Sequence, residues 1–113
     1  MTACTLAASR CHACEGGVAA LDEVRSRALL AGLHAWHLKE HWIEKTYCFA
    51  NHYEAMAFVN LVAWVSHRTD HHPEIVLGYK DVVVRYWTHA IGGLSENDFI
   101  CAAKIEKLLE ISG

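Results

Sequence analysis

Hydrophobic side chains recur along the first half of this chain at two different spacings. Over residues 21–33, and again from 51 to about 68, they return every three or four positions, which predicts two amphipathic helices. Residues 36–38 and 43–49 are instead strand-like, and the second of these runs alternates apolar with polar side chains. The short connection between the two runs predicts a β-hairpin.

The second half of the chain repeats this order. Residues 75–77 and 82–88 are typical of two further strands, joined by a turn at residues 78–81. The glycine pair at 92–93 ends the sheet, because two adjacent glycines favour a turn. A last helix is expected from about residue 95 to residue 109.

Two capping signals support the helix assignments. Asn51 precedes Glu54 by three residues and Ser95 precedes Asp98 by three, and such pairs satisfy backbone amides that have no helical partner. Hairpins separated by helices favour helices on one face of an antiparallel sheet. The sequence therefore predicts an α+β domain: a four-stranded antiparallel sheet with three helices packed on one face, in the order α-β-β-α-β-β-α.

Composition limits the chain to one domain. With 113 residues, 53% of them apolar and 20% charged, it can bury one core and no more. Residues 1–17, ended by Gly16-Gly17, are expected to be a flexible leader, and residues 18–113 the domain. The formal charge of −3 offers no basic field for direct binding of nucleic acid. Apolar stretches are too short to span a membrane and no signal peptide is apparent, so we expect a cytoplasmic protein.

The five cysteines are an odd, irregularly spaced set, which is no disulfide framework and fits a reducing cytosol. Cys11 and Cys14 form a Cys-x-x-Cys pair that could be half a zinc site or a redox pair. No second pair follows at zinc-finger spacing. We therefore favour a reduced leader without metal.

Nine histidines are the unusual count in this composition, and four of them fall between residues 67 and 89: His67, His71, His72 and His89. Pro73 forces the preceding residue toward an extended conformation, and neighbouring residues of an extended segment point to opposite sides. Such a cluster suits either a metal with three or four ligands or general acid–base catalysis near neutral pH. The other candidates are interpreted as incidental surface histidines: His34, His37, His41 and His52.

One spacing pattern resembles a known family. Asp70-His71-His72-Pro73-Glu74, Tyr79, Thr88-His89, Gly93-Leu94-Ser95 and Asp98 together resemble the signature of the pterin-4a-carbinolamine dehydratases. The order of helices and strands over about residues 20–111 fits the family fold, whereas the leader is not covered by the resemblance.

The resemblance implies an enzyme that dehydrates 4a-hydroxytetrahydrobiopterin to quinonoid dihydropterin, in the recycling of the pterin used by an aromatic amino acid hydroxylase. It implies a homodimer or homotetramer that needs no metal or organic cofactor. The residues it assigns fall into three groups: His71, His72 and His89 as catalytic histidines, Asp98 as their support, and Asp70, Pro73 and Thr88 as lining of the pterin pocket. We place His67 with Asp98 as a supporting residue.

The chain departs from the family pattern at two positions. His67 stands where many relatives have a glutamate that orients a histidine, and Ile75 stands where animal relatives often have a tryptophan. Asp98 also has a structural alternative, since its position would cap the last helix in any case. Tyr79 and Trp87 are interpreted as packing residues. The competing functions are a dehydratase-like scaffold, acting as a transcriptional or assembly cofactor through its oligomeric surface, and a histidine-bound metal protein.

Overall fold

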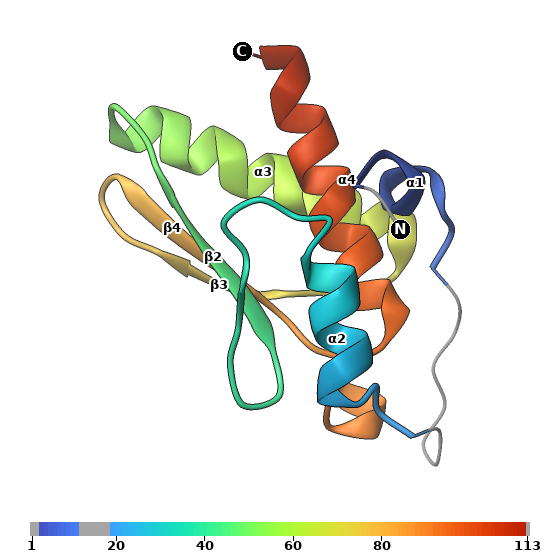
Figure 1. The fold of residues 1–113 in the computed structure, drawn as a ribbon. Coiled ribbons are helices and arrows are strands. Elements are labelled where there is room, and N and C mark those ends of the chain that lie inside the picture. The colour runs from blue at the N-terminus through green and yellow to red at the C-terminus, as the bar shows by residue number, and fades with distance from the viewer. Residues whose placement is uncertain (1–2, 12–18, 113) are drawn as a thin grey trace.

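The computed structural model describes residues 3–11 and 19–112 (Figure 1). Its elements, in chain order, are α1 Ala3–Ala8, α2 Glu23–Leu30, β1 His37–Leu38, β2 Ile43–Cys48, α3 His52–Thr69, β3 Glu74–Leu77, β4 Asp81–Tyr86, the 3-10 helix η1 His89–Ile91 and α4 Glu96–Ser112. Apart from α1 and η1, these are the helices and strands that the sequence predicts.

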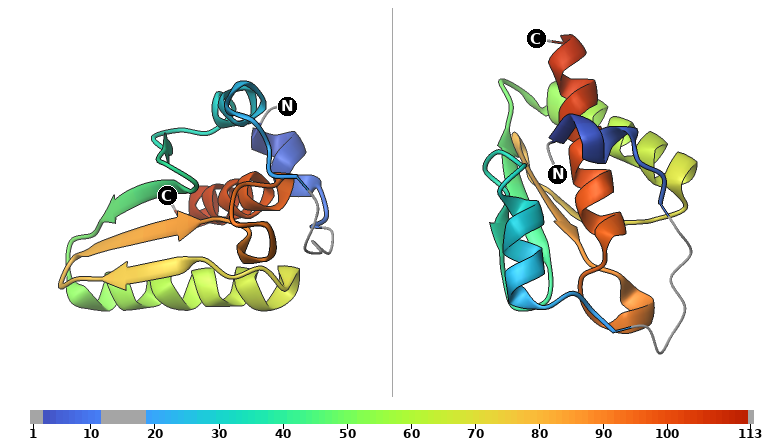
Figure 2. Two further views of the ribbon diagram at one scale, coloured as in Figure 1. Left: turned by 90° about the horizontal axis from the view of Figure 1, so that it is seen from below. Right: turned by 45° about the vertical axis from the view of Figure 1, so that its right-hand side comes forward.

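The four strands form one antiparallel sheet in the order β1-β2-β4-β3. Along β4, Val82, Val84 and Tyr86 are fully buried, whereas the alternate residues Val83 and Arg85 are only half-buried. Such alternation means that one face of the sheet carries the core and the other is left open. Helices α3 and α4 cover the buried face, and α2 lies beside α4 and β1 (Figures 1 and 2). The predicted α+β fold, with helices on one face, is confirmed.

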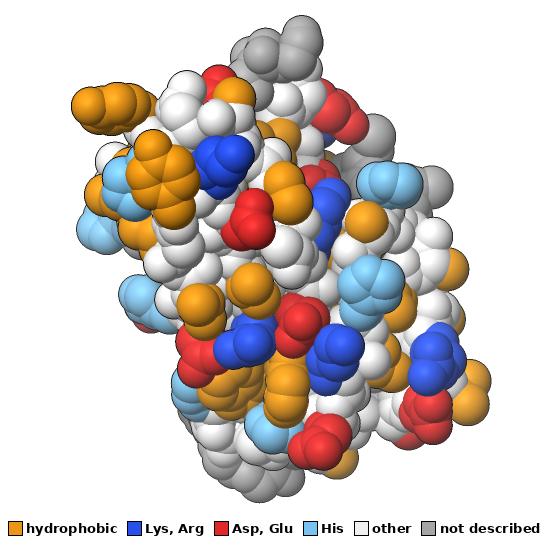
Figure 3. Space-filling model, turned by 90° about the vertical axis from the view of Figure 1, so that its left-hand side faces the viewer, with side chains coloured by type: hydrophobic (Ala, Val, Ile, Leu, Met, Phe, Trp, Pro, Cys, Tyr) orange, Lys and Arg blue, Asp and Glu red, His pale blue; other side chains and the backbone are white. Residues whose placement is uncertain are grey.

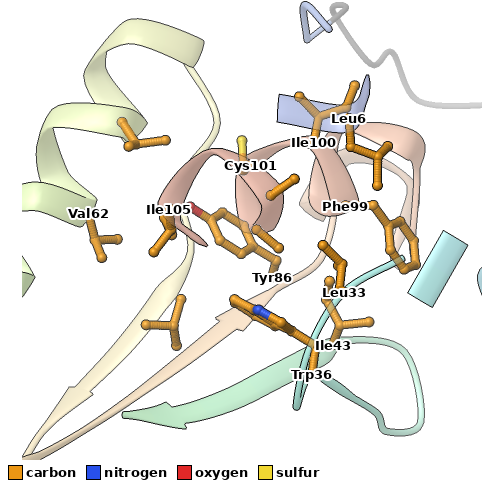
Figure 4. Packing of buried hydrophobic residues seen from close by; sticks show 14 of the residues in the cluster. Leu6, Leu33, Trp36, Ile43, Val62, Tyr86, Phe99, Ile100, Cys101 and Ile105 are labelled. Atoms are coloured by element: carbon orange, nitrogen blue, oxygen red, sulfur yellow. The ribbon is translucent and has the colours of Figure 1, made fainter. Parts of the chain in front are cut away.

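The core is centred on Tyr86. Figure 4 shows its ring beneath Cys101 and Ile105 of α4 and above Trp36, whose ring centroid lies 6.2 Å away. Residues of both the sheet and the helices are fully buried in this core, including Ile43 of β2 and Val62 of α3. The C-terminal end of β4 is therefore fixed against α4, and this contact positions the segment that precedes β3 and the segment that follows β4.

Helix α3 begins and ends at well-defined residues. The Asn51 side chain accepts a hydrogen bond from the Glu54 amide at 2.9 Å, and the Glu54 carboxylate accepts one from the Ala50 amide at 2.9 Å, so the predicted cap is confirmed. At its other end Asp70 adopts a left-handed conformation, with φ 52° and ψ 39°. This residue breaks the helix sharply and turns the chain into the segment that carries His71 and His72.

Helix α2 and strand β4 are shorter than predicted. Helix α2 begins at Glu23 rather than residue 21, because Asp22 caps it by accepting a hydrogen bond from the Arg25 amide at 2.8 Å, and it ends at Leu30 rather than residue 33. Strand β4 ends at Tyr86 rather than residue 88, because the Thr88 amide bonds instead to the Gly93 carbonyl at 2.8 Å. A short loop containing η1 therefore carries His89, and Gly92 closes that loop with a φ of 63°.

The prediction of a flexible leader is wrong for residues 3–11. This segment contains helix α1, which lies against α4 (Figure 2, right) and buries the Leu6 side chain completely. Lys104 of α4 also donates a hydrogen bond to the Ala7 carbonyl at 2.7 Å. A helix of 6 residues is too short to show a hydrophobic periodicity, so the sequence pattern could not predict α1. The rest of the expected leader, residues 12–17, lies outside the described residues.

Replacing Leu6 with alanine is expected to lower the free energy of unfolding by about 2 kcal/mol, because it removes a fully buried apolar side chain and leaves a void beside α4. Urea denaturation followed by circular dichroism measures the change. Val24→Ala is the matched control, since Val24 is 80% exposed and its truncation should cost under about 0.5 kcal/mol. Equal effects of the two substitutions would contradict the packing of α1 on the domain.

Candidate active site

Asp98, in the first turn of α4, is the fully buried centre of a hydrogen-bond network. Its Oδ1 lies 2.6 Å from Nε2 of His71. Its Oδ2 accepts hydrogen bonds from the Thr88 hydroxyl and the Ser95 amide, both at 2.9 Å. The Thr88 and Ser95 hydroxyls also bond to each other at 2.7 Å. Asp98 therefore caps α4 and holds His71 at the same time.

His71 is held on two sides. Besides its bond to Asp98, its ring stacks on Tyr86, with centroids 5.8 Å apart and an interplanar angle of 5°. Burial of this ring lowers its pKa, but the hydrogen bond to Asp98 and the negative charge of Asp98 outweigh that effect and raise the pKa above its usual value. An imidazolium is thereby favoured at a fixed position on the covered face of the sheet.

The pairing of β3 with β4 explains why His71 and His72 differ. Glu74 pairs with Arg85, and continuing that antiparallel register by one residue at a time places residue 72 beside residue 87 and residue 71 beside residue 88. Alternation then directs His71 to the covered face, with Asp98, and His72 to the open face, where it is exposed. The contact with Asp98 places His71 on the covered side, and the opposite direction of His72 stays a prediction from the strand register.

His89 lies on the open side, at the start of η1, and is exposed. Its ring stacks on Trp87 with centroids 4.3 Å apart and an interplanar angle of 26°. Trp87 lies 6.5 Å from Trp42, and His41 makes edge contacts with both indoles. At the C-terminal end of β4, the open side of the sheet therefore carries an aromatic surface formed by His41, Trp42 and Trp87, beside the exposed imidazole of His89.

Sequence reasoning missed this aromatic surface, because it treated Trp87 as a packing residue and His41 as incidental. One signal was present in the alternation of the strand: if Tyr86 faces the core, Trp87 must face the open side. The contribution of Trp42 and His41 had no such signal, since it depends on how β2 pairs with β4.

The remaining residues implied by the resemblance have different surroundings. Thr88 is buried and uses its hydroxyl on Asp98 and Ser95, so it supports the carboxylate from within the protein. Asp70 is exposed at the end of α3, and Pro73 is half-buried. His67 is exposed on the last turn of α3. Within the described residues, Asp98 is the carboxylate that bonds to His71.

The described residues include no cluster of metal ligands, and the face seen in Figure 3 has no excess of one sign of charge. Among the described residues, no three His, Cys, Asp or Glu side chains are grouped as metal ligands would be. Cys11 contacts Cys101, and Cys14 lies outside the described residues. Figure 3 shows acidic, basic and histidine side chains interspersed on one face, so neither sign of charge dominates it. In the part of the chain that the structure describes, no helix is long and apolar enough to cross a membrane.

This arrangement separates two roles chemically. A buried, carboxylate-bound imidazole provides a fixed positive charge or a proton donor, whereas an exposed imidazole can contact a bound molecule directly. The adjacent indoles can pack against a flat ring.

Comparison with known proteins identifies the family of this chain. A family model described as "Pterin 4 alpha carbinolamine dehydratase" matches residues 19–108. The chain belongs to the pterin-4-alpha-carbinolamine dehydratase family. Two bacterial members of it carry the name "Putative pterin-4-alpha-carbinolamine dehydratase". The protein from Dechloromonas aromatica is 64% identical over 97% of this chain and 98% of its own length. The one from Nitrosomonas eutropha is 54% identical over 94% and 95%.

Solved structures agree with this family fold. A structure from Brucella melitensis titled "transcriptional coactivator/pterin dehydratase" superposes with a TM-score of 0.75 at 27% identity, covering 79% of this chain and 97% of that one. A pterin dehydratase-like protein described as a RuBisCO assembly factor of the alpha-carboxysome gives a TM-score of 0.58 at 24% identity, covering 66% and 89%. The second likeness shows a shared fold alone.

Proposed function

We propose that this protein is a 4a-hydroxytetrahydrobiopterin dehydratase, a hydro-lyase that removes water from the pterin carbinolamine to give quinonoid dihydropterin. The observation that carries the proposal is the division of the histidines: His71 is held by buried Asp98, while His72 and His89 are exposed and His89 stacks on Trp87. Family membership supplies the substrate class, and the geometry supports acid–base chemistry upon it.

The reaction needs two proton movements. The C4a hydroxyl must gain a proton to leave as water, and a ring nitrogen must lose one as the quinonoid system forms. We assign both transfers to His72 and His89, whose exposed rings can reach a substrate lying against Trp87. His71 is the positioned cation of the site, and Asp98, supported by Thr88 and Ser95, fixes its orientation.

The substrate also needs a surface that fits a flat bicyclic ring. Trp87, Trp42 and His89 supply aromatic faces at the open end of β4, and aromatic rings favour offset or edge contacts with one another. Asp70 and Pro73, in the segment between α3 and β3, are proposed to line the same region. The tryptophan that animal relatives often carry at position 75 is absent here; Ile75 pairs with Val84 and packs against the core, so Trp87 and Trp42 on the open side are proposed as the indoles that contact the ring.

A dehydration assay tests the proposal. 4a-Hydroxytetrahydrobiopterin is generated in situ by a phenylalanine hydroxylase, and formation of quinonoid dihydropterin is followed by absorbance with and without this protein. We expect a rate that rises in proportion to protein concentration and is unchanged by a metal chelator. A rate equal to the spontaneous one would overturn the proposed function. A functional link to an aromatic amino acid hydroxylase, in the cytoplasm, follows from the proposed substrate.

A scaffold function is the second candidate, since the Brucella melitensis relative carries the word coactivator in its title. The two functions differ in what they require of the site. A scaffold would keep its partner binding when His72 and His89 are replaced, whereas the proposed enzyme would lose its activity. The carboxylate–histidine network at Asp98 favours the enzyme, because a binding surface has no need of a buried charged pair.

Self-association is proposed to involve the edge strand β3. This strand is at the end of the sheet, and its Val76 and Leu77 are 46% and 38% exposed. An apolar edge strand is a ready template for pairing with another copy. Val76→Lys is therefore expected to convert a dimer or tetramer into a monomer in sedimentation velocity at micromolar concentration. Val24→Lys, on exposed α2, is the control that should leave the assembly unchanged. A monomeric wild-type protein would contradict this prediction.

A further inference from the structure

Two cysteines far apart in the sequence meet between the N-terminal segment and α4. The Sγ atoms of Cys11 and Cys101 lie 3.6 Å apart, although 90 residues separate them. Cys101 is fully buried and its thiol also contacts the Thr69 hydroxyl at 3.5 Å. Cys11 is half-buried and follows α1 in a segment without regular structure, so its side chain can move toward Cys101. Bond formation needs an approach of roughly 1.5 Å.

Cys11 is also accessible to a small reagent. It lines a cavity of about 570 Å³ together with four basic side chains, those of Arg10, Arg68, Lys104 and Lys107. A cationic, solvent-filled cavity favours the thiolate, which is the reactive form of cysteine. Cys101 is fully buried, whereas Cys11 lines the cavity, so an oxidant that enters the cavity meets Cys11 first.

The charge environment distinguishes the two thiols. A hydrogen bond from Cys101 lowers the pKa of Cys11 to about 7; burial and Asp98 oppose this, and His71 and Lys104 assist it. The same contact raises the pKa of Cys101, and burial raises it further. Cys11 is thus the thiolate and Cys101 the neutral thiol that bonds to it. This is the asymmetry expected of an attacking and a resolving cysteine.

We propose that Cys11 and Cys101 are a redox-modification site, which closes to a reversible disulfide on reaction with a hydroperoxide. The Cys11 thiolate attacks the terminal peroxide oxygen, the O–O bond breaks, and the departing alkoxide takes up a proton and leaves as an alcohol, or as water from hydrogen peroxide. Cys11 is then a sulfenic acid. The Cys101 sulfur attacks the Cys11 sulfur, the S–O bond breaks, and the Cys101 proton leaves with hydroxide as water. Two thiols lose two electrons and the peroxide gains them.

The disulfide would join the N-terminal segment covalently to α4, close to the site network. Cys101 follows Asp98 by one turn of helix, and Thr69 immediately precedes the segment that carries His71. The Cys11 thiolate also helps to raise the pKa of His71, because a nearby negative charge favours the protonated ring. Oxidation removes that charge, so the pKa of His71 is expected to fall on oxidation. This inference is independent of the proposed dehydratase activity.

Peptide mapping tests the pairing directly. The full-length reduced protein is treated with stoichiometric hydrogen peroxide, alkylated, digested with trypsin and analysed by mass spectrometry. We expect loss of two thiols and a linked pair of peptides, residues 11–25 and 86–104, that dithiothreitol separates. Because the first peptide contains Cys14 as well as Cys11, the experiment is repeated on Cys14→Ser, where the same link must form. A link through Cys14, Cys4 or Cys48, or over-oxidation of Cys11 with Cys101 still reduced, would overturn the proposal.

Two variants test the separate roles of Cys11 and Cys101. In Cys101→Ala, Cys11 should stop at the sulfenic acid and be trapped by dimedone. In Cys11→Ser, which alters a half-buried position only, Cys101 should stay reduced. Cys48 is the internal control: its contact with Asp81 raises its pKa, so at pH 7 iodoacetamide should label Cys11 roughly five-fold faster. Faster labelling of Cys48 would contradict the assignment of Cys11 as the reactive thiol.

Thermal unfolding supplies an independent measurement. A link between residues so far apart constrains the unfolded chain strongly, so the oxidised protein should unfold about 10 °C above the reduced one. The difference should vanish in Cys11→Ser and persist in Cys48→Ser. An oxidised protein that carries the Cys11–Cys101 link and unfolds below the reduced form would show that closure strains the fold, and would contradict the geometry on which the proposal rests.

Discussion

Replacing His72 or His89 with alanine is expected to lower the rate of pterin dehydration about 10²- to 10⁴-fold, the usual contribution of a general acid or base. Both side chains are exposed, and His89 stacks on Trp87, so each is proposed to act on a substrate without support from the core. The rate is measured with 4a-hydroxytetrahydrobiopterin generated in situ by a hydroxylase. Because proton transfer acts on the chemical step, the loss should fall mainly on kcat, with a smaller change in KM.

The controls separate catalysis from folding. His34→Ala and His37→Ala remove exposed histidines that lie outside the site, and they should retain wild-type rates. Circular dichroism and urea denaturation of His72→Ala and His89→Ala should match the wild type within about 0.5 kcal/mol, since exposed side chains contribute little to stability. Wild-type rates in both active-site variants would refute the assignment of the two proton transfers.

The sequence predicted the sheet and its long helices because these depend on local rules. Alternation along residues 43–49, together with the Asn51 cap, depends on neighbours within a few positions and needs no knowledge of the fold. The structure places β2 over residues 43–48 and begins α3 at residue 52. The end of β4 moved because of a hydrogen bond that the alternation does not reveal: the Gly93 carbonyl takes the Thr88 amide and thereby ends the strand early.

The candidate site was predictable as a set of residues but not as an arrangement. Spacing and family resemblance pointed to His71, His72 and His89, yet the division of labour among them depends on pairing between β3 and β4. The carboxylate that holds His71 comes from α4, 27 positions away, and no local pattern connects the two. The same limit applies to Cys11 and Cys101, because the packing of α1 on α4 brings them together.

Asp98→Asn is expected to lower the free energy of unfolding by about 3 kcal/mol at pH 6, because it removes one partner of a fully buried charged pair. Asparagine can still accept hydrogen bonds from Thr88 and the Ser95 amide, so the cap of α4 survives and the loss reports mainly on His71. Asp22→Asn is the matched control. Asp22 caps α2 through the Arg25 amide but is exposed and, within the part of the chain that the structure describes, bonds to no histidine, so that variant should change stability by less than about 0.5 kcal/mol.

The pH dependence of that loss gives the sharper test. In the wild type the pKa of His71 is raised above its usual 6.5, so its stabilising effect is complete below pH 6.5 and is lost as pH rises through the raised pKa. In Asp98→Asn only burial acts strongly on the ring and lowers its pKa, so that variant should gain stability as pH rises toward 6.5. The difference between the two proteins should therefore be largest near pH 5.5 and smallest at alkaline pH, measured by urea denaturation alongside an NMR titration of His71. A difference that stays constant with pH would mean that Asp98 stabilises the fold through its cap alone and leaves the protonation of His71 unchanged.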